Sequence, residues 1–133
     1  MKQKEMFDAV KKENVLSYSP YSKYRVSAAC LLKDGRIITG INIENSSYGL
    51  SICAERCTLF RVYAEGYKRD DIVSLMIYTN RLDSMPYPCG ACRQVMSELM
   101  PMDAKVYIVN DQEMEEEYTV SSLIPHCFTP DNL

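Results

Sequence analysis

Two cysteine motifs constrain the fold of this chain more than any other feature of its sequence. Cys53 stands at the start of an apolar segment with helical spacing, and Glu55 follows two residues later. Cys89 and Cys92 form a Pro-Cys-x-x-Cys motif at the start of a second such segment. The dipole and the free N–H groups of a helix N-terminus favour thiolates. A fold that packs these two helices side by side would bring three cysteines and one carboxylate to one point.

The rest of the chain alternates between helical and strand patterns. The pair Asp34-Gly35 separates two apolar runs and is a strong hairpin-turn signal, so those runs are expected to be antiparallel strands. In chain order, the sequence predicts a helix at 4–16, strands at 24–32 and 36–43, a helix at 53–65, a strand at 71–79, a helix at 91–100, a strand at 104–110, and a turn with an edge strand at 111–120. This order is typical of an α/β domain in which helices cover a mixed sheet of about five strands.

Helical spacing also predicts which side of each helix is buried. In the N-terminal helix, Met6, Phe7 and Val10 share one side. Each cysteine-bearing helix has one apolar face, made by Cys53, Cys57, Phe60 and Ala64 in the first helix and by Cys92, Val95, Met96 and Leu99 in the second. We therefore expect Cys57 to begin a packing face and not to join a metal site.

Length and composition indicate one globular domain spanning residues 1–133. The chain has 133 residues, of which 47% are hydrophobic and 25% charged. Its N-terminus, MKQKEMFDAVKK, lacks the apolar core of a signal peptide, and the longest uncharged apolar run, VSAACLL, is too short to cross a bilayer. These features predict a soluble cytoplasmic protein without a membrane partner. The formal net charge of -3 argues against a nucleic acid partner, because phosphate binding needs clustered Lys and Arg.

The six cysteines favour metal binding or catalysis over a disulfide framework in a chain expected in a reducing compartment. On its own, the pair Cys89 and Cys92 fits a metal site and a redox dithiol equally well. Cys53 and Glu55 favour metal, since three thiolates leave a fourth tetrahedral position for water and a nearby carboxylate can carry protons. The other three cysteines are expected to be small buried side chains: Cys30, Cys57 and Cys127.

The Cys-x-Glu and Pro-Cys-x-x-Cys motifs resemble those of the zinc deaminases. Over nearly the whole chain, the sequence is similar to the small, homotetrameric cytidine deaminases of pyrimidine salvage, which have a three-layer α/β/α fold. Four stretches carry the resemblance, in this order: SPYSKYRVSAA, NIENSSYGLSICAER, PCGACRQVMSEL and LIPHCFTPDNL. The resemblance implies hydrolysis of cytidine and 2'-deoxycytidine to uridine and 2'-deoxyuridine, with release of ammonia, by a homotetramer.

The resemblance also implies a role for each site residue. One Zn2+ per subunit would be held by Cys53, Cys89 and Cys92 and would carry a hydroxide. Glu55 would be the proton shuttle, and Arg56 would donate hydrogen bonds to the ligand sulfurs. Six residues would bind the nucleoside: Asn42 and Glu44 at the ribose, Tyr24 and Phe128 against the pyrimidine ring, Tyr48 near a subunit boundary, and Ala54.

Asn42 and Glu44 fit this role on physical grounds as well. Alternate residues of a strand face the same side, so the two can offer an amide and a carboxylate to sugar hydroxyls. Four other positions depart from the family pattern: Tyr24 stands where Phe is usual, Arg25 where Pro is frequent, Ser27 where Gly is usual, and Thr129 where Gly commonly follows the aromatic residue. Ser27 and Thr129 each add a side chain where the family usually has glycine, so we expect them to affect the shape of the pocket.

Three alternatives stay open from the residues alone. His126 could complete a structural zinc site with four protein ligands, although this leaves Glu55 without a role. A deaminase acting on another aminated nucleoside, such as blasticidin S, would share both cysteine motifs, but such enzymes lack the stretch NIEN found at 42–45. Deamination of a polynucleotide is disfavoured by the acidic balance and by the lack of a basic patch interleaved with aromatic residues.

Overall fold

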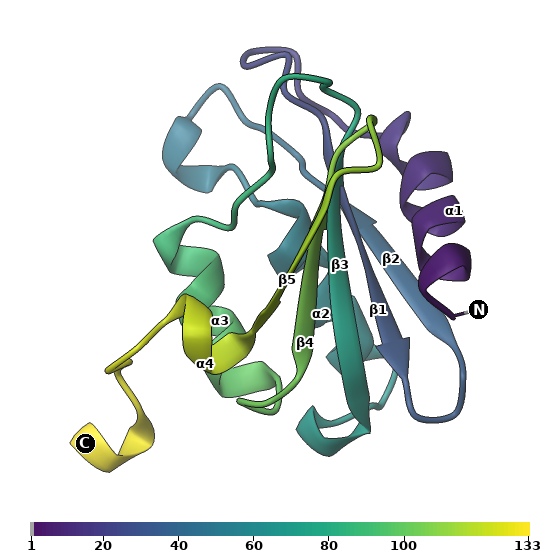
Figure 1. The fold of residues 1–133 in the computed structure, drawn as a ribbon. Helices are drawn as coiled ribbons and strands as arrows, with labels where there is room; N and C mark the ends of the chain where they lie inside the picture. The colour runs from purple at the N-terminus through teal and green to yellow at the C-terminus, as the bar shows by residue number, and fades with distance from the viewer. Residues whose placement is uncertain (1) are drawn as a thin grey trace.

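The computed structural model describes residues 2–133, which form a five-stranded sheet with helices on both faces (Figure 1). The elements are α1 (Lys2–Asn14), β1 (Val26–Leu32), β2 (Ile37–Ile41), α2 (Ala54–Ala64), β3 (Ile72–Thr79), α3 (Gly90–Leu99), β4 (Lys105–Val109), β5 (Glu115–Thr119) and α4 (Val120–Leu123). Short 3-10 turns lie at Tyr48–Leu50, Arg69–Asp71 and Pro130–Asn132. Every predicted helix and strand occurs, and the structure has one further helix, α4, that was not predicted from the sequence.

The sheet has the strand order β2-β1-β3-β4-β5. β3 and β4 are parallel, and the other neighbouring strands are antiparallel, so the predicted mixed sheet is confirmed. β1 and β2 form the predicted hairpin, where Gly35 has a φ of 90° that residues with a side chain rarely adopt. The parallel pair requires a crossover connection, which contains α3.

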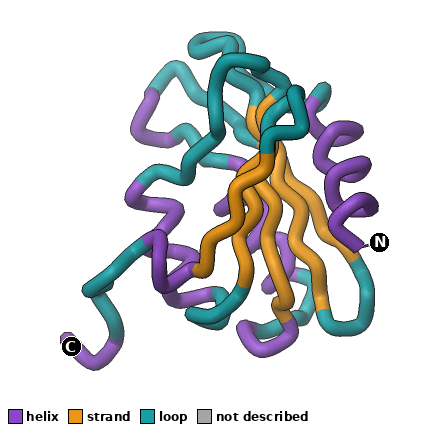
Figure 2. Tube along the Cα trace, viewed as in Figure 1, coloured by secondary structure: helices purple, strands orange, loops and turns teal. Residues whose placement is uncertain are grey.

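The helices form two layers around the sheet. α1 packs on one face against β1, β2 and β3, while α2 packs on the other face against β1 and β2, beside α3 (Figure 2). The three-layer α/β/α prediction is therefore confirmed. Within residues 2–133, no helix combines the length and the apolar composition that a membrane span requires.

Helices cover both faces of the sheet, which explains why β1 and β3 are mostly apolar and carry no charged residue. Side chains of β1 alternate between two cores: Ala28 and Cys30 pack toward α2 and α3, and Ala29 and Leu31 pack toward α1. The predicted faces of α1 and α3 are confirmed, since their apolar side chains pack in these two cores.

The predicted packing face of α2 is wrong. Phe60 is 48% exposed and Ala64 is also exposed, and the half-buried Cys57 lies on this side of the helix. The buried side chains of α2 are instead Ala54, Glu55, Thr58, Leu59 and Val62. Helical spacing alone permitted either face, because both carry small and apolar residues.

Close contact between α2 and β2 decides which face of the helix is buried. A Cβ atom on Gly40 would lie only 2.4 Å from Thr58 Oγ1 and 2.8 Å from Thr58 N. The hydroxyl of Thr58 donates a hydrogen bond to Ala54 O at 2.7 Å, so it can be buried without an unsatisfied polar atom. The missing side chain at Gly40 thus lets the Thr58 side of α2 approach the sheet, and the opposite side remains at the surface.

Candidate active site

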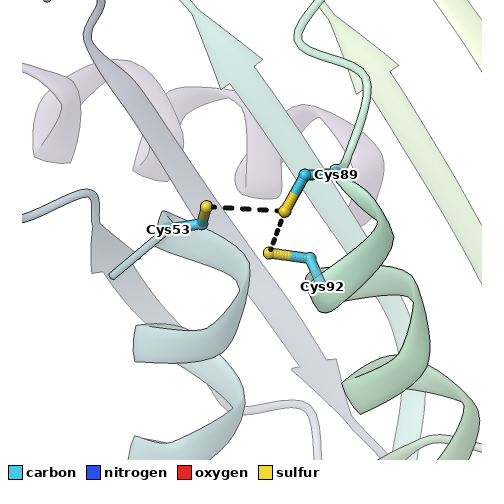
Figure 3. A group of neighbouring side chains, drawn as sticks. All are labelled: Cys53, Cys89 and Cys92. Carbon is cyan, nitrogen blue, oxygen red and sulfur yellow. Dashed lines mark hydrogen bonds between the residues drawn. The ribbon is translucent and has the colours of Figure 1, made fainter. Parts of the chain in front are cut away.

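The N-termini of α2 and α3 bring three cysteine sulfurs together (Figure 3). Cys53 is the N-cap of α2, Cys89 is the N-cap of α3, and Cys92 lies in the first turn of α3. Cys53 Sγ lies 3.8 Å from Cys89 Sγ, which lies 3.6 Å from Cys92 Sγ. A tetrahedral zinc ion with Zn–S bonds of ~2.3 Å separates its sulfur ligands by about 3.8 Å. The three side chains therefore fit this ion in number, chemistry and spacing.

The protonation of the cluster already favours metal binding. Hydrogen bonding to the neighbouring Cys92 thiol lowers the pKa of Cys53, and the guanidinium of Arg56 acts in the same direction against the effect of burial. Arg56 Nη2 donates to Cys53 Sγ at 3.6 Å. The pKa of Cys92 is raised, because the thiol hydrogen-bonds to Cys53 and is desolvated by burial. The direction of the shift at Cys53 favours its thiolate, which is the form that coordinates a metal ion.

Glu55 lies in the first turn of α2 and is only 4% exposed. Burial raises the pKa of its carboxyl group to about 7, and the nearby negative charge of Cys53 acts in the same direction. A carboxyl group in such surroundings can both accept and donate a proton near neutral pH. Packing alone does not favour an acid at this position, so its burial next to the sulfurs indicates a chemical role.

A cavity of about 480 Å³ is lined by Cys53, Cys89 and Glu55. Its wall comes from the segment before β1, the segment after β2, the N-terminus of α2 and the loop that leads to α3. This volume is within the range of small-molecule sites. The cavity therefore has room for a ligand of the size of a nucleoside.

The structure places four of the six predicted nucleoside-binding residues in the cavity wall: Tyr24, Asn42, Glu44 and Ala54. Tyr48 and Phe128 do not line it and are 61% and 57% exposed. The ring of Tyr48 instead packs edge-on against Tyr21, with the ring centroids 6.1 Å apart. Within one chain, Tyr48 and Phe128 therefore lie outside the cavity. That they contact the nucleoside stays a prediction for the assembled protein.

The positions of His126 and of the other cysteines test the alternative of a structural zinc site with four protein ligands. His126 is exposed and does not belong to the group of converging ligand atoms formed by the three cysteines among residues 2–133. Cys30 is fully buried in the core, where desolvation raises its pKa to about 12, whereas Cys57 and Cys127 are half-buried. A four-ligand structural site with His126 is therefore not formed in this fold.

Comparison with known proteins agrees with this geometry. A family model described as the cytidine and deoxycytidylate deaminase zinc-binding region matches residues 1–109. This chain belongs to that family. The cytidine deaminase of Halalkalibacterium halodurans is 51% identical over 117 residues, which cover 88% of this chain and 86% of the relative. The probable cytidine deaminase of Dictyostelium discoideum is 36% identical over 95% of this chain and 83% of its own length.

Solved structures of the deaminase family have the same fold. The cytidine deaminase of Burkholderia pseudomallei matches with a TM-score of 0.91 and 36% identity, covering 96% of this chain and all of its own (100%). The enzyme from Mycobacterium tuberculosis matches with a TM-score of 0.81 and 30% identity, over 97% of this chain and 98% of its own. The zinc-binding region of this deaminase family and the three-cysteine cluster together fit one zinc ion per chain.

Several side chains of the deaminase cavity were not predicted from the sequence. Ser22 lines it from the segment before β1, and Ser84 and Tyr87 line it from the loop before α3. A signal existed for Tyr87, which directly precedes the Pro-Cys-x-x-Cys motif. Nothing in their local sequence marks Ser22 and Ser84, because their place in the wall depends on how distant segments meet.

Proposed function

We propose that this chain is a zinc-dependent hydrolase of pyrimidine salvage that converts cytidine and 2'-deoxycytidine into uridine and 2'-deoxyuridine, with release of ammonia. The observation that supports this most directly is the buried carboxyl group of Glu55 beside three converging sulfurs, in a cavity whose wall also carries Asn42 and Glu44. A structural zinc site needs a fourth protein ligand and has no use for a buried acid.

The chemistry divides between the metal site and Glu55. Cys53, Cys89 and Cys92 would hold the zinc ion, which would act as a Lewis acid and make water nucleophilic near neutral pH. The carboxylate of Glu55 takes a proton from the attacking water and passes it to the ring nitrogen N3 of cytosine. Once the water oxygen has bonded to C4, Glu55 takes the remaining proton of that hydroxyl group and gives it to the amino group. The C4–N bond then breaks, ammonia leaves, and C4 becomes the carbonyl carbon of uracil.

We assign Asn42 and Glu44 to the ribose. The Asn42 side chain accepts from Val26 N at 3.1 Å and donates to Tyr24 O at 2.8 Å, which fixes the amide and leaves one of its N–H groups for a sugar hydroxyl. The carboxylate of Glu44 accepts from Tyr21 N at 3.1 Å and Ser22 N at 3.2 Å. Although desolvation opposes it, hydrogen bonding from Ser22 lowers the pKa of Glu44, so an ionised acceptor with free lone pairs faces the sugar.

We also propose that the active protein is a cytoplasmic homotetramer. Its support is the resemblance to the small cytidine deaminases, together with the exposed apolar side chains of Tyr48, Leu50, Phe60 and Phe128. Exposed apolar groups of this size mark association surfaces when they lie together. Contact between chains would also give Tyr48 and Phe128 a route to a nucleoside that neither reaches alone.

Substitution Glu55→Gln tests the proposed reaction. The amide keeps the shape of the side chain but cannot carry a proton, so we expect zinc content to be unchanged and turnover of cytidine, followed by its absorbance, to fall by about 10²-fold to 10⁴-fold. Glu98→Gln, at an exposed position of α3, is the matched control and should leave turnover unchanged. A folded, zinc-loaded wild-type protein that does not deaminate cytidine would contradict the proposal.

A further inference from the structure

The loop that forms one wall of the cavity is held from outside the cavity. Tyr87 lies in this loop between β3 and α3 and lines the cavity. Its hydroxyl lies 3.0 Å from each carboxylate oxygen of Glu116, a residue of β5 at the edge of the sheet. Glu116 itself is not part of the cavity wall. The edge strand β5 thus contacts the wall of the proposed substrate site through Tyr87.

The fold, and not the loop, fixes the position of this carboxylate. Tyr118, two residues further along β5, also donates its hydroxyl to Glu116 and packs against the core. Alternation along the strand places both on the face of the sheet that α3 covers. Glu117 points to the other face and pairs with Lys105 at 3.0 Å. Glu116 is therefore an ordered acceptor on a rigid element.

Separate hydrogen bonds hold the end of this loop that leads into Cys89. Arg93 Nε donates to Pro88 O at 2.8 Å, and Arg93 Nη1 donates to Leu123 O at 3.0 Å. These bonds hold the residue before Cys89 without help from β5. Loss of the contact between Tyr87 and Glu116 would therefore release the tyrosine side chain while the cysteine cluster kept its support.

We propose that Glu116 is a positioning residue for substrate binding, which fixes the part of the cavity wall that Tyr87 forms. The inference rests on the proposed deaminase function. A side chain already ordered before the ligand arrives costs less conformational entropy on binding than a free one. Because Glu116 touches neither the sulfurs nor Glu55, its effect falls on the affinity for the nucleoside and not on the chemical step.

Steady-state kinetics of four variants and one control variant test this role. Glu116→Ala and Tyr87→Phe should each raise KM for cytidine about threefold to tenfold, with kcat and zinc content unchanged. The double variant should be no worse than either single one, because both remove the same contact. Glu116→Gln keeps an acceptor oxygen and should recover part of the loss. Glu117→Ala, the next residue of β5, is the control and should leave KM unchanged.

The outcomes separate this inference from the proposed function. Wild-type turnover combined with an unchanged KM in Glu116→Ala and Tyr87→Phe would overturn the positioning role alone. A parallel loss of zinc and kcat at constant KM would overturn it too, since it would show that Glu116 supports the metal site. Additive effects in the double variant would mean that the two residues act separately, which would also overturn the positioning role. Absence of turnover in the wild-type protein would remove the proposed function and this inference together.

Discussion

Arg56 is a cation placed beside the cysteine cluster. Its Nη2 lies 3.6 Å from Cys53 Sγ, and hydrogen bonding to that sulfur raises the pKa of the guanidinium. Its buried Nε has no hydrogen-bond partner within residues 2–133. A fixed positive charge beside three thiolates offsets charge that would otherwise weaken the Lewis acidity of a bound ion.

Removal of this cation should affect chemistry more than folding. We expect Arg56→Ala to lower kcat or zinc affinity about 10-fold to 100-fold, because the sulfurs lose their donor, and to change the free energy of unfolding much less. Metal analysis, cytidine turnover and urea denaturation measure the three quantities. Arg61→Ala, which removes an exposed arginine paired with Glu65 on the same helix, is the control. Equal zinc content and equal rate in Arg56→Ala would contradict this account.

The departures from the family pattern find local partners. The extra hydroxyl of Tyr24 hydrogen-bonds Ser84 Oγ at 2.8 Å, so it ties two parts of the cavity wall together. Ser27 faces α1, where its hydroxyl donates to Val10 O at 2.6 Å, and it does not enter the cavity. Thr129 caps the 3-10 turn that follows it by accepting from Asp131 N at 3.2 Å. Of these three side chains, only Tyr24 changes the cavity.

At the scale of elements, the site depends on the orientation of α2. The same helix presents Cys53 and Glu55 at its N-terminus and rests on the sheet through Thr58 and Gly40. A rotation of this helix would move both site residues, because they belong to its first turn or its cap. Packing in the middle of α2 therefore controls geometry at its end.

An added methyl group at Gly40 tests this contact. We expect Gly40→Ala to lower the free energy of unfolding by about 1–3 kcal/mol, because the new Cβ would meet backbone atoms of Thr58 that cannot turn away. Urea denaturation measures the change. At Gly90 an added Cβ meets no atom within 4 Å, so Gly90→Ala serves as the control. Equal stability of Gly40→Ala and the wild-type protein would show that α2 and β2 are less tightly packed.

At the scale of the whole molecule, one chain provides the three-cysteine cluster and the cavity beside it. The two aromatic residues that remain outside, Tyr48 and Phe128, belong to segments near the surface. Phe60 on α2 is also exposed, on the helix side that the sequence predicted to be buried. A second chain packed against this side of α2 would bury the apolar side chains that are exposed in a single chain.

Light scattering measures the assembly directly. We expect a mass in solution of four times the 15.3 kDa of one chain. Phe60→Asp should shift this mass toward smaller species, because a carboxylate is costly to bury in an apolar interface. Glu98→Gln, already the control for turnover, should keep the wild-type mass. A monomeric wild-type protein with full activity would contradict the proposed tetramer.

The sequence by itself determined the helices and strands other than α4, their order, and which residues we propose to bind metal and move protons. These features depend on local chemistry: hairpin-forming Asp34-Gly35, helical periodicity, and cysteines at two helix starts. Tertiary structure alone decided which face of α2 is buried, which predicted residues reach the cavity, and that Glu116 holds Tyr87. Such features depend on contacts between segments that are distant in the sequence. Close packing at one point, such as Gly40 against Thr58, sets the position of the whole helix α2.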